Sequence, residues 1–304
     1  MGHPAYIILV TAMRFEIITI FPGFFTGIFE HGIVRRALVE GLVAVTTHDL
    51  RAFTHDRHRT VDDRPFGGGE GMVLKPEPLA KALASLGIEA KAGRGEVQKQ
   101  ILCSADEDRS AQDDKPGGDE TRVILLSAQG RPFTQAVARE LAGLERVVLI
   151  CGRYEGVDER INQLYCDMEL SVGDYVLSGG ELAAAVVVDA VMRLVPGVLG
   201  NEASGEFESF GVADAEIATD EEGVPRSQHG SGGLLDYPHY TRPAEFGGLR
   251  APEVLLNGDH QQIRKWRREQ QLRKTLENRP DLLERAELSH EDRSILKAIQ
   301  RDLE

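Results

Sequence analysis

The stretch of sequence that decides the fold is Val147-Val-Leu-Ile-Cys-Gly-Arg-Tyr-Glu-Gly-Val-Asp-Glu-Arg160. It opens with a short apolar run, Val147–Cys151, whose β-branched residues predict a buried strand. A glycine-containing turn follows, and then a segment of helical period at Val157–Leu164. A second stretch repeats this order, with a strand at Met168–Val172, a glycine-rich turn and a helix at Glu181–Leu194. Strands that alternate with helices in this way predict an α/β domain built on a largely parallel sheet.

The same alternation continues toward the N-terminus. Further strands are predicted at Arg14–Phe21, Val43–Leu50 and Arg122–Ala128, and further helices at Phe24–Val39, Pro78–Leu86 and Thr134–Leu144. Residues 259–304 differ, because they are rich in Gln, Arg and Glu and place apolar residues at helical spacings. We therefore divide the chain into an N-terminal extension, residues 1–12, an α/β domain, residues 13–200, a flexible linker, residues 201–234, and a small α-helical domain, residues 235–304.

The charge of the chain is unevenly distributed. Its 304 residues carry a formal net charge of −14, which by itself disfavours a nucleic-acid partner, because Lys and Arg drive phosphate binding. Residues 104–121 hold seven acidic and two basic residues, and residues 211–232 hold five and one. We interpret both as acidic, disordered insertions that stay away from RNA. Arg264–Arg279, in contrast, holds seven basic and two acidic residues, which indicates either a solvated helix face or a surface for an RNA backbone.

Cysteine and histidine usage narrows the class of protein. Cys103, Cys151 and Cys166 form no Cys-x-x-Cys pair, which disfavours a zinc ribbon or a disulfide framework and favours the reducing cytoplasm. The histidines show no metal-ligand spacing, so no metal site is predicted from them. The apolar run from Tyr6 to Ala12 follows no Lys or Arg and is far shorter than the roughly 18 residues that cross a bilayer. We expect neither a signal peptide nor a membrane partner.

The two glycine-rich turns are the first candidate ligand site. Ligands of α/β sheets bind at the carboxyl ends of the strands, and the turns Gly152–Gly156 and Gly173–Gly180 both begin there. Their glycines open the backbone to a ligand, and Tyr175, Val176 and Leu177 can line an apolar slot for a flat ring. Two tight turns with ordinary helix caps would explain the same residues, so this pattern alone leaves both interpretations open.

Two other segments carry residue types that phosphates or bases need. The glycines of Gly67–Gly71 let backbone N–H groups approach a phosphate or a base. A flexible surface loop fits this segment as well, and a nucleotide hydrolase is disfavoured because no Lys-Ser/Thr follows it. Tyr237, Tyr240 and Arg242 can stack on unpaired bases and hold a phosphate. The same three residues can also form a rigid loop packed on the domain surface.

Seven motifs together resemble one family. The motifs are Arg14-Phe-Glu-Ile-Ile-Thr-Ile-Phe-Pro22, Asp63-Arg-Pro-Phe-Gly-Gly-Gly-Glu-Gly-Met72, Cys151-Gly-Arg-Tyr-Glu-Gly-Val-Asp-Glu-Arg160, Val172-Gly-Asp-Tyr-Val-Leu-Ser-Gly-Gly-Glu-Leu182, Val195-Pro-Gly-Val-Leu-Gly200, Tyr237-Pro-His-Tyr-Thr-Arg-Pro243 and Ile263-Arg-Lys-Trp266. In this order they are similar to the bacterial tRNA (guanine-N1)-methyltransferases, the TrmD family of the SPOUT class. The resemblance covers Met13 to about Leu283, apart from the two acidic insertions.

The resemblance implies methyl transfer from S-adenosylmethionine to N1 of guanosine 37, which lies immediately 3′ of the anticodon in tRNA. It also implies a trefoil-knotted, SPOUT-type parallel-sheet domain, whereas fold rules alone predict an unknotted sheet. The helical domain would bind the tRNA anticodon stem-loop, and the enzyme would be a homodimer with active sites at the interface. The alternative is a nonenzymatic RNA-binding protein with a degenerate cofactor pocket.

The same resemblance implies the site residues. The cofactor would be held by Ser127, Gly152, Tyr154, Gly156, Val172, Gly173, Asp174, Tyr175, Val176, Leu177, Gly179 and Gly180. Arg193 would stabilise negative charge on O6 of the base. Glu155 would lie close to the cofactor as a metal-dependent helper, with Mg²⁺ as the candidate ion. Without the resemblance, Arg193 would be interpreted as a cation that complements a helix C-terminus.

The catalytic base is where this sequence departs from the family. Family members carry an Asp in the linker before Ser-Phe, whereas this chain reads Glu206-Phe-Glu-Ser-Phe210, which puts Glu208 in that position. Our hypothesis is that Glu208 is the general base, and that a linker which orders on tRNA binding accommodates its extra methylene. Glu206 and Asp214 are the alternatives. Ala128 and Ala183 stand where family members often carry Pro, which leaves the geometry of the cofactor loops less defined.

Overall fold

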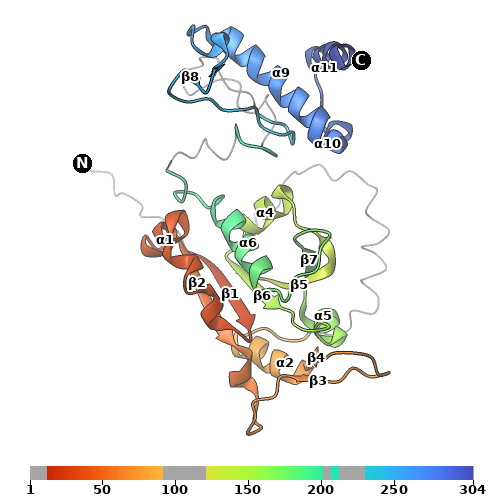
Figure 1. Ribbon diagram of the computed structural model, residues 1–304. Helices are drawn as coiled ribbons and strands as arrows, with labels where there is room; N and C mark the ends of the chain where they lie inside the picture. The colour runs from red at the N-terminus through yellow and green to blue at the C-terminus, as the bar shows by residue number, and fades with distance from the viewer. Residues whose placement is uncertain (1–11, 92–120, 201–206, 212–229, 304) are drawn as a thin grey trace, which may run out of the picture. The chain divides into compact units, whose positions relative to one another are not determined.

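The structure is a computed structural model that describes residues 12–91, 121–200, 207–211 and 230–303. The chain divides into two compact units, one up to Val198 and one from Leu199 onward (Figure 1). The predicted N-terminal extension and both acidic insertions lie almost entirely outside the described residues, so the predicted disorder of the insertions stays a prediction.

The first unit is built on a five-stranded sheet in which every described strand pair is parallel. The strand order is β2-β1-β6-β5-β7, with β1 at Met13–Thr19, β2 at Val43–Asp49, β5 at Thr121–Pro132, β6 at Arg146–Cys151 and β7 at Met168–Ser171. This confirms the predicted α/β class and the five predicted strands, since each begins within one residue of its expected position.

Alternating side chains along the strands fill a core on each face of the sheet. Phe15 and Ile17 of β1 pack with one set of helices, and Ile18 packs with another. The first face is covered by α1 (Gly32–Val39), α4 (Gln135–Ala142) and α6 (Glu181–Met192), and the second by η3 (Leu50–Phe53), α2 (Pro76–Ser85) and α5 (Glu159–Tyr165). The near-continuous apolar runs of β5 and β6 follow from this burial on both sides.

The helix predicted at Phe24–Val39 is wrong as a single element. The segment instead forms two short 3-10 helices, η1 at Pro22–Phe25 and η2 at Ile28–Glu30, before α1 begins at Gly32. Extended backbone at His31 and a φ of +60° at Gly32 separate η2 from α1. Glycine adopts this left-handed conformation without steric cost, so apolar periodicity alone did not reveal the break.

Strand β5 is longer than predicted because it pairs with β7 twice. Leu126 pairs with Leu170, the register then slips, and Arg131 pairs with Leu170 again. Residues 127–130 therefore bulge away from the ladder. Gly130 crosses so close to β7 that a Cβ there would lie 2.5 Å from the backbone nitrogen of Leu170. Only glycine permits this crossing.

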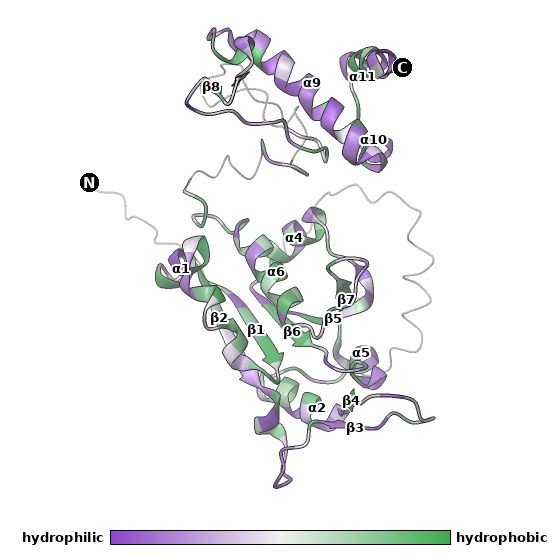
Figure 2. Ribbon diagram, viewed as in Figure 1, coloured by the Kyte–Doolittle hydropathy of each residue, from purple (hydrophilic) through white to green (hydrophobic). Residues whose placement is uncertain are grey.

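The second unit is mainly helical. It contains α9 (His260–Asn278), α10 (Pro280–Arg285) and α11 (His290–Leu303), together with η4 (Glu253–Leu255). Two strands of two residues each, β8 (Glu245–Phe246) and β9 (Leu249–Arg250), form a short hairpin. Leu234, Leu272 and Ile299 form its small core. Figure 2 shows α9 as mostly hydrophilic, in contrast to the hydrophobic strands β1 and β6. Within the described part of the chain, no helix is long and apolar enough to span a membrane.

Candidate active site

A cavity of about 290 Å³ lies at the carboxyl ends of β5, β6 and β7. Three segments form most of it: residues 125–129 of β5, the loop after β6 (residues 152–157, the β6 loop), and the end of β7 from residue 169 with the loop that follows it (residues 172–180, the β7 loop). Its volume is at the lower end of the range of small-molecule pockets. Parallel sheets place ligands at this edge, so the cavity is the candidate active site.

The β6 loop is held in a conformation that few residues adopt. Tyr154 has a φ of 59° and Gly156 a φ of 128°. The short strand β4 (Val73–Leu74), which pairs with β3 (Asp62–Asp63), supports the loop from one side. The Leu74 N–H donates to the Gly156 carbonyl at 3.0 Å, and the Asp158 N–H donates to the Leu74 carbonyl at the same distance. The glycine-rich loop 65–71, between β3 and β4, thus leads directly to the pocket.

Hydrogen bonds within the β7 loop fix its shape, and a backbone hydrogen bond joins it to the β6 loop. Ser171 Oγ donates to the Gly173 carbonyl at 3.0 Å, and the Tyr175 hydroxyl donates to the Val172 carbonyl at 3.1 Å. The Gly180 N–H donates to the Gly152 carbonyl at 2.9 Å. A Cβ on Gly180 would lie only 2.7 Å from the Cα of Cys151. The two loops therefore touch backbone to backbone, which explains the glycine at this position.

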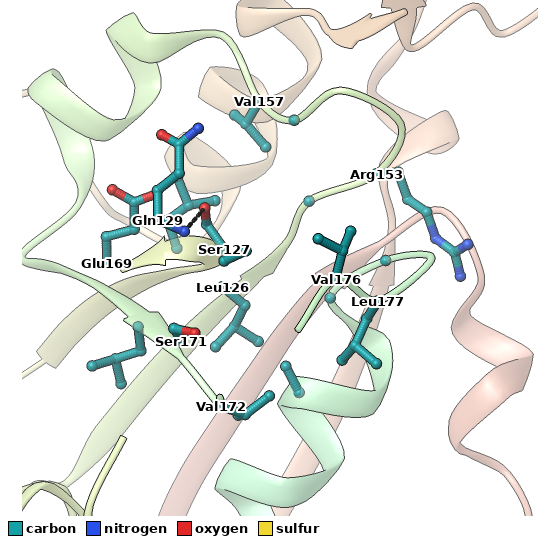
Figure 3. A pocket seen from close by; sticks show the side chains of 18 of the residues that line it. Leu126, Ser127, Gln129, Arg153, Val157, Glu169, Ser171, Val172, Val176 and Leu177 are labelled. Atoms are coloured by element: carbon teal, nitrogen blue, oxygen red, sulfur yellow. Dashed lines mark hydrogen bonds between the residues drawn. The ribbon is translucent and has the colours of Figure 1, made fainter. Parts of the chain in front are cut away.

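The pocket has an apolar side and a polar side. Figure 3 shows Leu126, Val172, Val176 and Leu177 gathered on one side, with Ser127, Gln129 and Glu169 across from them. Its rim carries further carboxylates at Glu155 and Glu159, both exposed. The one cationic side chain of the lining, Arg153, is ion-paired with Glu181 at 2.9 Å. Unpaired charge in the lining is therefore negative, which favours a ligand with an apolar ring and a positive charge.

The thiol behind the pocket is not a nucleophile. Cys151 is buried, and burial raises its pKa well above the usual thiol range, with the nearby carboxylate of Glu181 acting in the same direction. The thiolate is the reactive form of cysteine. The pocket therefore offers no covalent catalyst of this kind.

Most of the predicted cofactor residues meet in this cavity. Ser127, Gly152, Tyr154, Gly156, Val172, Gly173, Tyr175, Val176, Leu177, Gly179 and Gly180 all line it, as does Glu155. Asp174 does not, because it is exposed outside the lining. The sequence motifs do not indicate Gln129 or Glu169, since neither belongs to a glycine-rich turn and only the bulge in β5 brings Gln129 to the pocket.

The other predicted catalytic residues are not among the described residues that line the pocket. Arg193 is half-buried at the C-cap of α6, whereas the pocket borders the first turn of that helix. Glu208 belongs to the second unit, in a turn where the Gly211 N–H donates to the Glu208 carbonyl at 3.0 Å. Phe210 and Gly211 in turn are hydrogen-bonded to the segment 231–234. The alternatives Glu206 and Asp214 are outside the described residues.

The second unit presents the predicted basic helix. Tyr237 is buried, and the guanidinium carbon of Arg267 lies 4.9 Å from the centre of its ring. Tyr240 is half exposed, with its ring centre 6.2 Å from that of Trp266. Of the two tyrosines, only Tyr240 is thus open to a stacking partner.

No group of three His, Cys, Asp or Glu side chains that could hold a metal ion occurs among the residues described.

Comparison with known proteins identifies the family. A family model described as tRNA (Guanine-1)-methyltransferase TrmD matches residues 13–285. The tRNA (guanine-N(1)-)-methyltransferase of Koribacter versatilis (strain Ellin345) is 54% identical over 288 residues, which cover 95% of this chain and 98% of the relative. The proteins of the same name from Geobacter sulfurreducens and Pelotomaculum thermopropionicum are 44% and 47% identical, over 95% and 94% of this chain and 99% and 96% of theirs. With both pocket loops inside the matched region, the chain belongs to the tRNA (guanine-1)-methyltransferase family TrmD.

Proposed function

We propose that this protein transfers a methyl group from S-adenosylmethionine to N1 of guanosine 37, immediately 3′ of the anticodon in tRNA. The observation that carries the proposal is the convergence of the two glycine-rich loops, both within the family match, on one pocket. The relatives bear the name tRNA (guanine-N(1)-)-methyltransferase, and membership of this family makes the chain an S-adenosylmethionine-dependent methyltransferase. This favours the enzyme over the nonenzymatic RNA-binding alternative.

The pocket residues fit the cofactor. Val172, Val176 and Leu177 offer an apolar surface to the adenine ring, and Gly152, Gly179 and Gly180 let the backbone approach it closely. Glu155, Glu159 and Glu169 supply the negative charge that suits a sulfonium cation. When bound, S-adenosylmethionine supplies an electrophilic methyl group. The loops orient it, and alignment of this kind can lower a barrier by as much as roughly 7–11 kcal/mol. We propose that Glu155, which is exposed at the rim, is a ligand of Mg²⁺.

The position of Arg193 supports a homodimer. Because an α-helix rises about 1.5 Å per residue, Arg193 lies roughly 18 Å along α6 from Glu181, the residue that follows Gly180 of the pocket lining. In a homodimer, Arg193 would stabilise charge on O6 of a base bound at the pocket of the second copy. The exposed side of α6 carries Leu182 and Val186, both about half exposed, ahead of the exposed Asp189, and η1 beside it exposes Phe24. Such a face suits burial against the same face of another protomer.

Glu208 is the proposed general base. Its carboxylate would accept the proton of N1, a role worth about 10²–10⁴-fold in rate, while Arg193 stabilises the charge that moves to O6.

The basic helix α9 and the exposed ring of Tyr240 would hold the anticodon stem-loop through phosphate contacts and stacking. For the first unit we propose the trefoil knot that membership of the family implies. Cys151 and Cys166 are buried free thiols, in keeping with a cytoplasmic enzyme.

The test is radiolabelled methyl transfer to two tRNA transcripts, one with guanosine and one with adenosine 3′ of the anticodon. We expect label to enter only the first. Glu208→Gln should abolish transfer and leave binding of S-adenosylhomocysteine nearly unchanged, while Glu284→Gln, an exposed carboxylate of the same unit, serves as the matched control. Label in the adenosine transcript would overturn the site assignment. Normal turnover of Glu208→Gln would overturn the base and point to Glu206 or Asp214.

A further inference from the structure

A buried carboxylate that methyl transfer does not use lies behind the pocket. Glu181 begins α6 and is 1% exposed, but it does not line the cavity. Its Oε1 accepts the hydroxyl proton of Thr19 at 2.7 Å, and its Oε2 accepts from Arg153 Nε at 3.0 Å and lies 2.9 Å from Arg153 Nη2 in the ion pair. All described hydrogen bonds of this carboxylate thus come from two distant segments, the end of β1 and the β6 loop.

Arg153 connects the two pocket loops through its side chain. Besides binding Glu181, its Nη1 donates to the Ser178 carbonyl of the β7 loop at 2.9 Å. Its guanidinium carbon lies 4.6 Å from the centre of the Phe21 ring, just past β1. A Cβ on Gly179 would overlap the Arg153 side chain, so a glycine there leaves the space that the arginine occupies. One side chain therefore joins the β6 loop, the β7 loop and the end of β1.

The loops need such a connection because their sequence supplies little rigidity. Gly156 and Gly173 have φ values of 128° and 152°, and glycine samples many conformations unless other contacts restrict it. Separating a buried, ionised carboxylate from its hydrogen-bond partners costs much free energy, because its charge would then be unpaired in a low-dielectric environment. The ion pair thus restrains the separation of the two loops more firmly than a surface contact would.

We infer that Glu181 is a positioning residue for the cofactor: through Arg153 it sets the spacing of the β6 and β7 loops and thereby the affinity for S-adenosylmethionine. This inference rests on the proposed function. Glu181 does not touch the cavity, so its effect must pass through Arg153 and the loops. The effect should fall on the cofactor and not on tRNA.

The experiment compares Glu181→Gln with the unmodified enzyme. Since displacement of a positioned group by about 1 Å can cost on the order of 10²-fold, we expect about 10- to 100-fold weaker binding of S-adenosylhomocysteine by calorimetry. The KM for S-adenosylmethionine should rise by a similar factor, with the KM for tRNA unchanged. The matched control is Glu140→Gln, which breaks the exposed pair with Arg131 at 3.3 Å in the same unit and should leave both values unchanged.

A purely structural role would give a different result. It would lower the folded fraction and hence the apparent kcat, while the folded molecules would keep the normal KM for S-adenosylmethionine; that outcome overturns the inference. The double variant Arg153→Gln/Glu181→Gln should bind no more weakly than Arg153→Gln alone, because the effect of Glu181 passes through Arg153. If Glu181→Gln does not fold, Glu181→Asp tests the same ion pair, because it keeps the charge but shortens the reach to Arg153. An unchanged affinity of the folded Glu181→Asp variant would overturn the inference. Failure of the unmodified enzyme to bind S-adenosylhomocysteine would instead refute the proposed function.

Discussion

The buried ion pair of the second unit makes the sharpest prediction about stability. Arg268 on α9 and Asp292 on α11 have side chains that are 10% and 7% exposed, and they form two parallel bonds at 2.7 and 2.9 Å. Asp292 also accepts the Ser289 N–H at 3.0 Å, which helps to cap α11. The pair therefore joins the first and last long helices of the unit and fixes the beginning of α11.

Replacing Arg268 with Met should destabilise the second unit by about 3–5 kcal/mol. Met fills most of the volume, but it leaves the Asp292 carboxylate buried without its cation, and breaking a buried pair in this way typically has a cost of that size. With a urea dependence of about 2 kcal/mol per molar, the unfolding midpoint should fall by about 2 M. A domain with a stability of about 5–15 kcal/mol would lose a large part of it.

Tryptophan fluorescence provides the assay. The chain has one tryptophan, Trp266 on α9, so its emission reports urea unfolding of the second unit in the full-length protein. Arg279→Met is the matched control, because Arg279 makes the same two-bonded geometry with Asp281 at the surface and should leave the midpoint unchanged. Arg268→Met/Asp292→Asn should recover part of the loss, since Asn still accepts from Ser289 but carries no charge. A midpoint for Arg268→Met that matches the unmodified protein would refute the reasoning.

The pH dependence has a definite sign. Burial acts to raise the pKa of Asp292, but the hydrogen bonds and charge of Arg268, with the bonds from Ser289, lower it below its usual 3.8. A carboxyl whose pKa is depressed by folding contributes stability above its unfolded pKa and loses it as the pH falls through the folded value. The midpoint difference between the unmodified protein and Arg268→Met should therefore be largest near neutral pH and narrow below about pH 4.

Three further predictions concern the first unit. Gly180→Ala should weaken S-adenosylhomocysteine binding by about 10-fold or more, because the new Cβ would press on the backbone at Cys151; Gly143→Ala, whose Cβ would meet nothing closer than 3.6 Å, should not change it. In a Cys103→Ser variant at pH 8, Ellman's reagent should find no reactive thiol until urea is added, since burial raises the pKa of Cys166 to about 12 and that of Cys151 as well. Thr134→Ala should lower the stability of the first unit by about 1 kcal/mol in thermal unfolding, because the Thr134 hydroxyl caps α4.

The strands and the pocket loops could be predicted because their information is local. Apolar runs of four to eight residues between glycine turns identify buried strands, and β6 and β7 lie within a residue of their predicted bounds. Where the backbone departs from a regular period, the sequence was less informative. The break before Gly32 depends on a positive φ, and the length of β5 depends on a second pairing with β7 that nothing in its own residues indicates.

The contacts that organise the pocket could not be predicted for a different reason. Thr19 and Glu181 are 162 residues apart and meet only because α6 packs on the sheet that contains β1. Glu181 resembles an ordinary acidic residue in the first turn of a helix, where it complements the dipole. Its burial and its bond to Arg153 follow from tertiary structure alone. A single sequence without an alignment holds no information on such a pair.

The two ends of α6 carry different parts of the proposed chemistry, and this is the strongest reason to expect an assembly of two chains. Its first turn fixes the cofactor loops through Glu181, whereas its C-cap presents Arg193 roughly 18 Å away. A rigid helix cannot bring both ends to one substrate base. In an antiparallel arrangement of two α6 helices through the exposed faces at Leu182 and Val186, each C-cap would approach the partner's first turn. The proposed homodimer would then account both for the exposure of Leu182 and Val186 and for the distant position of Arg193.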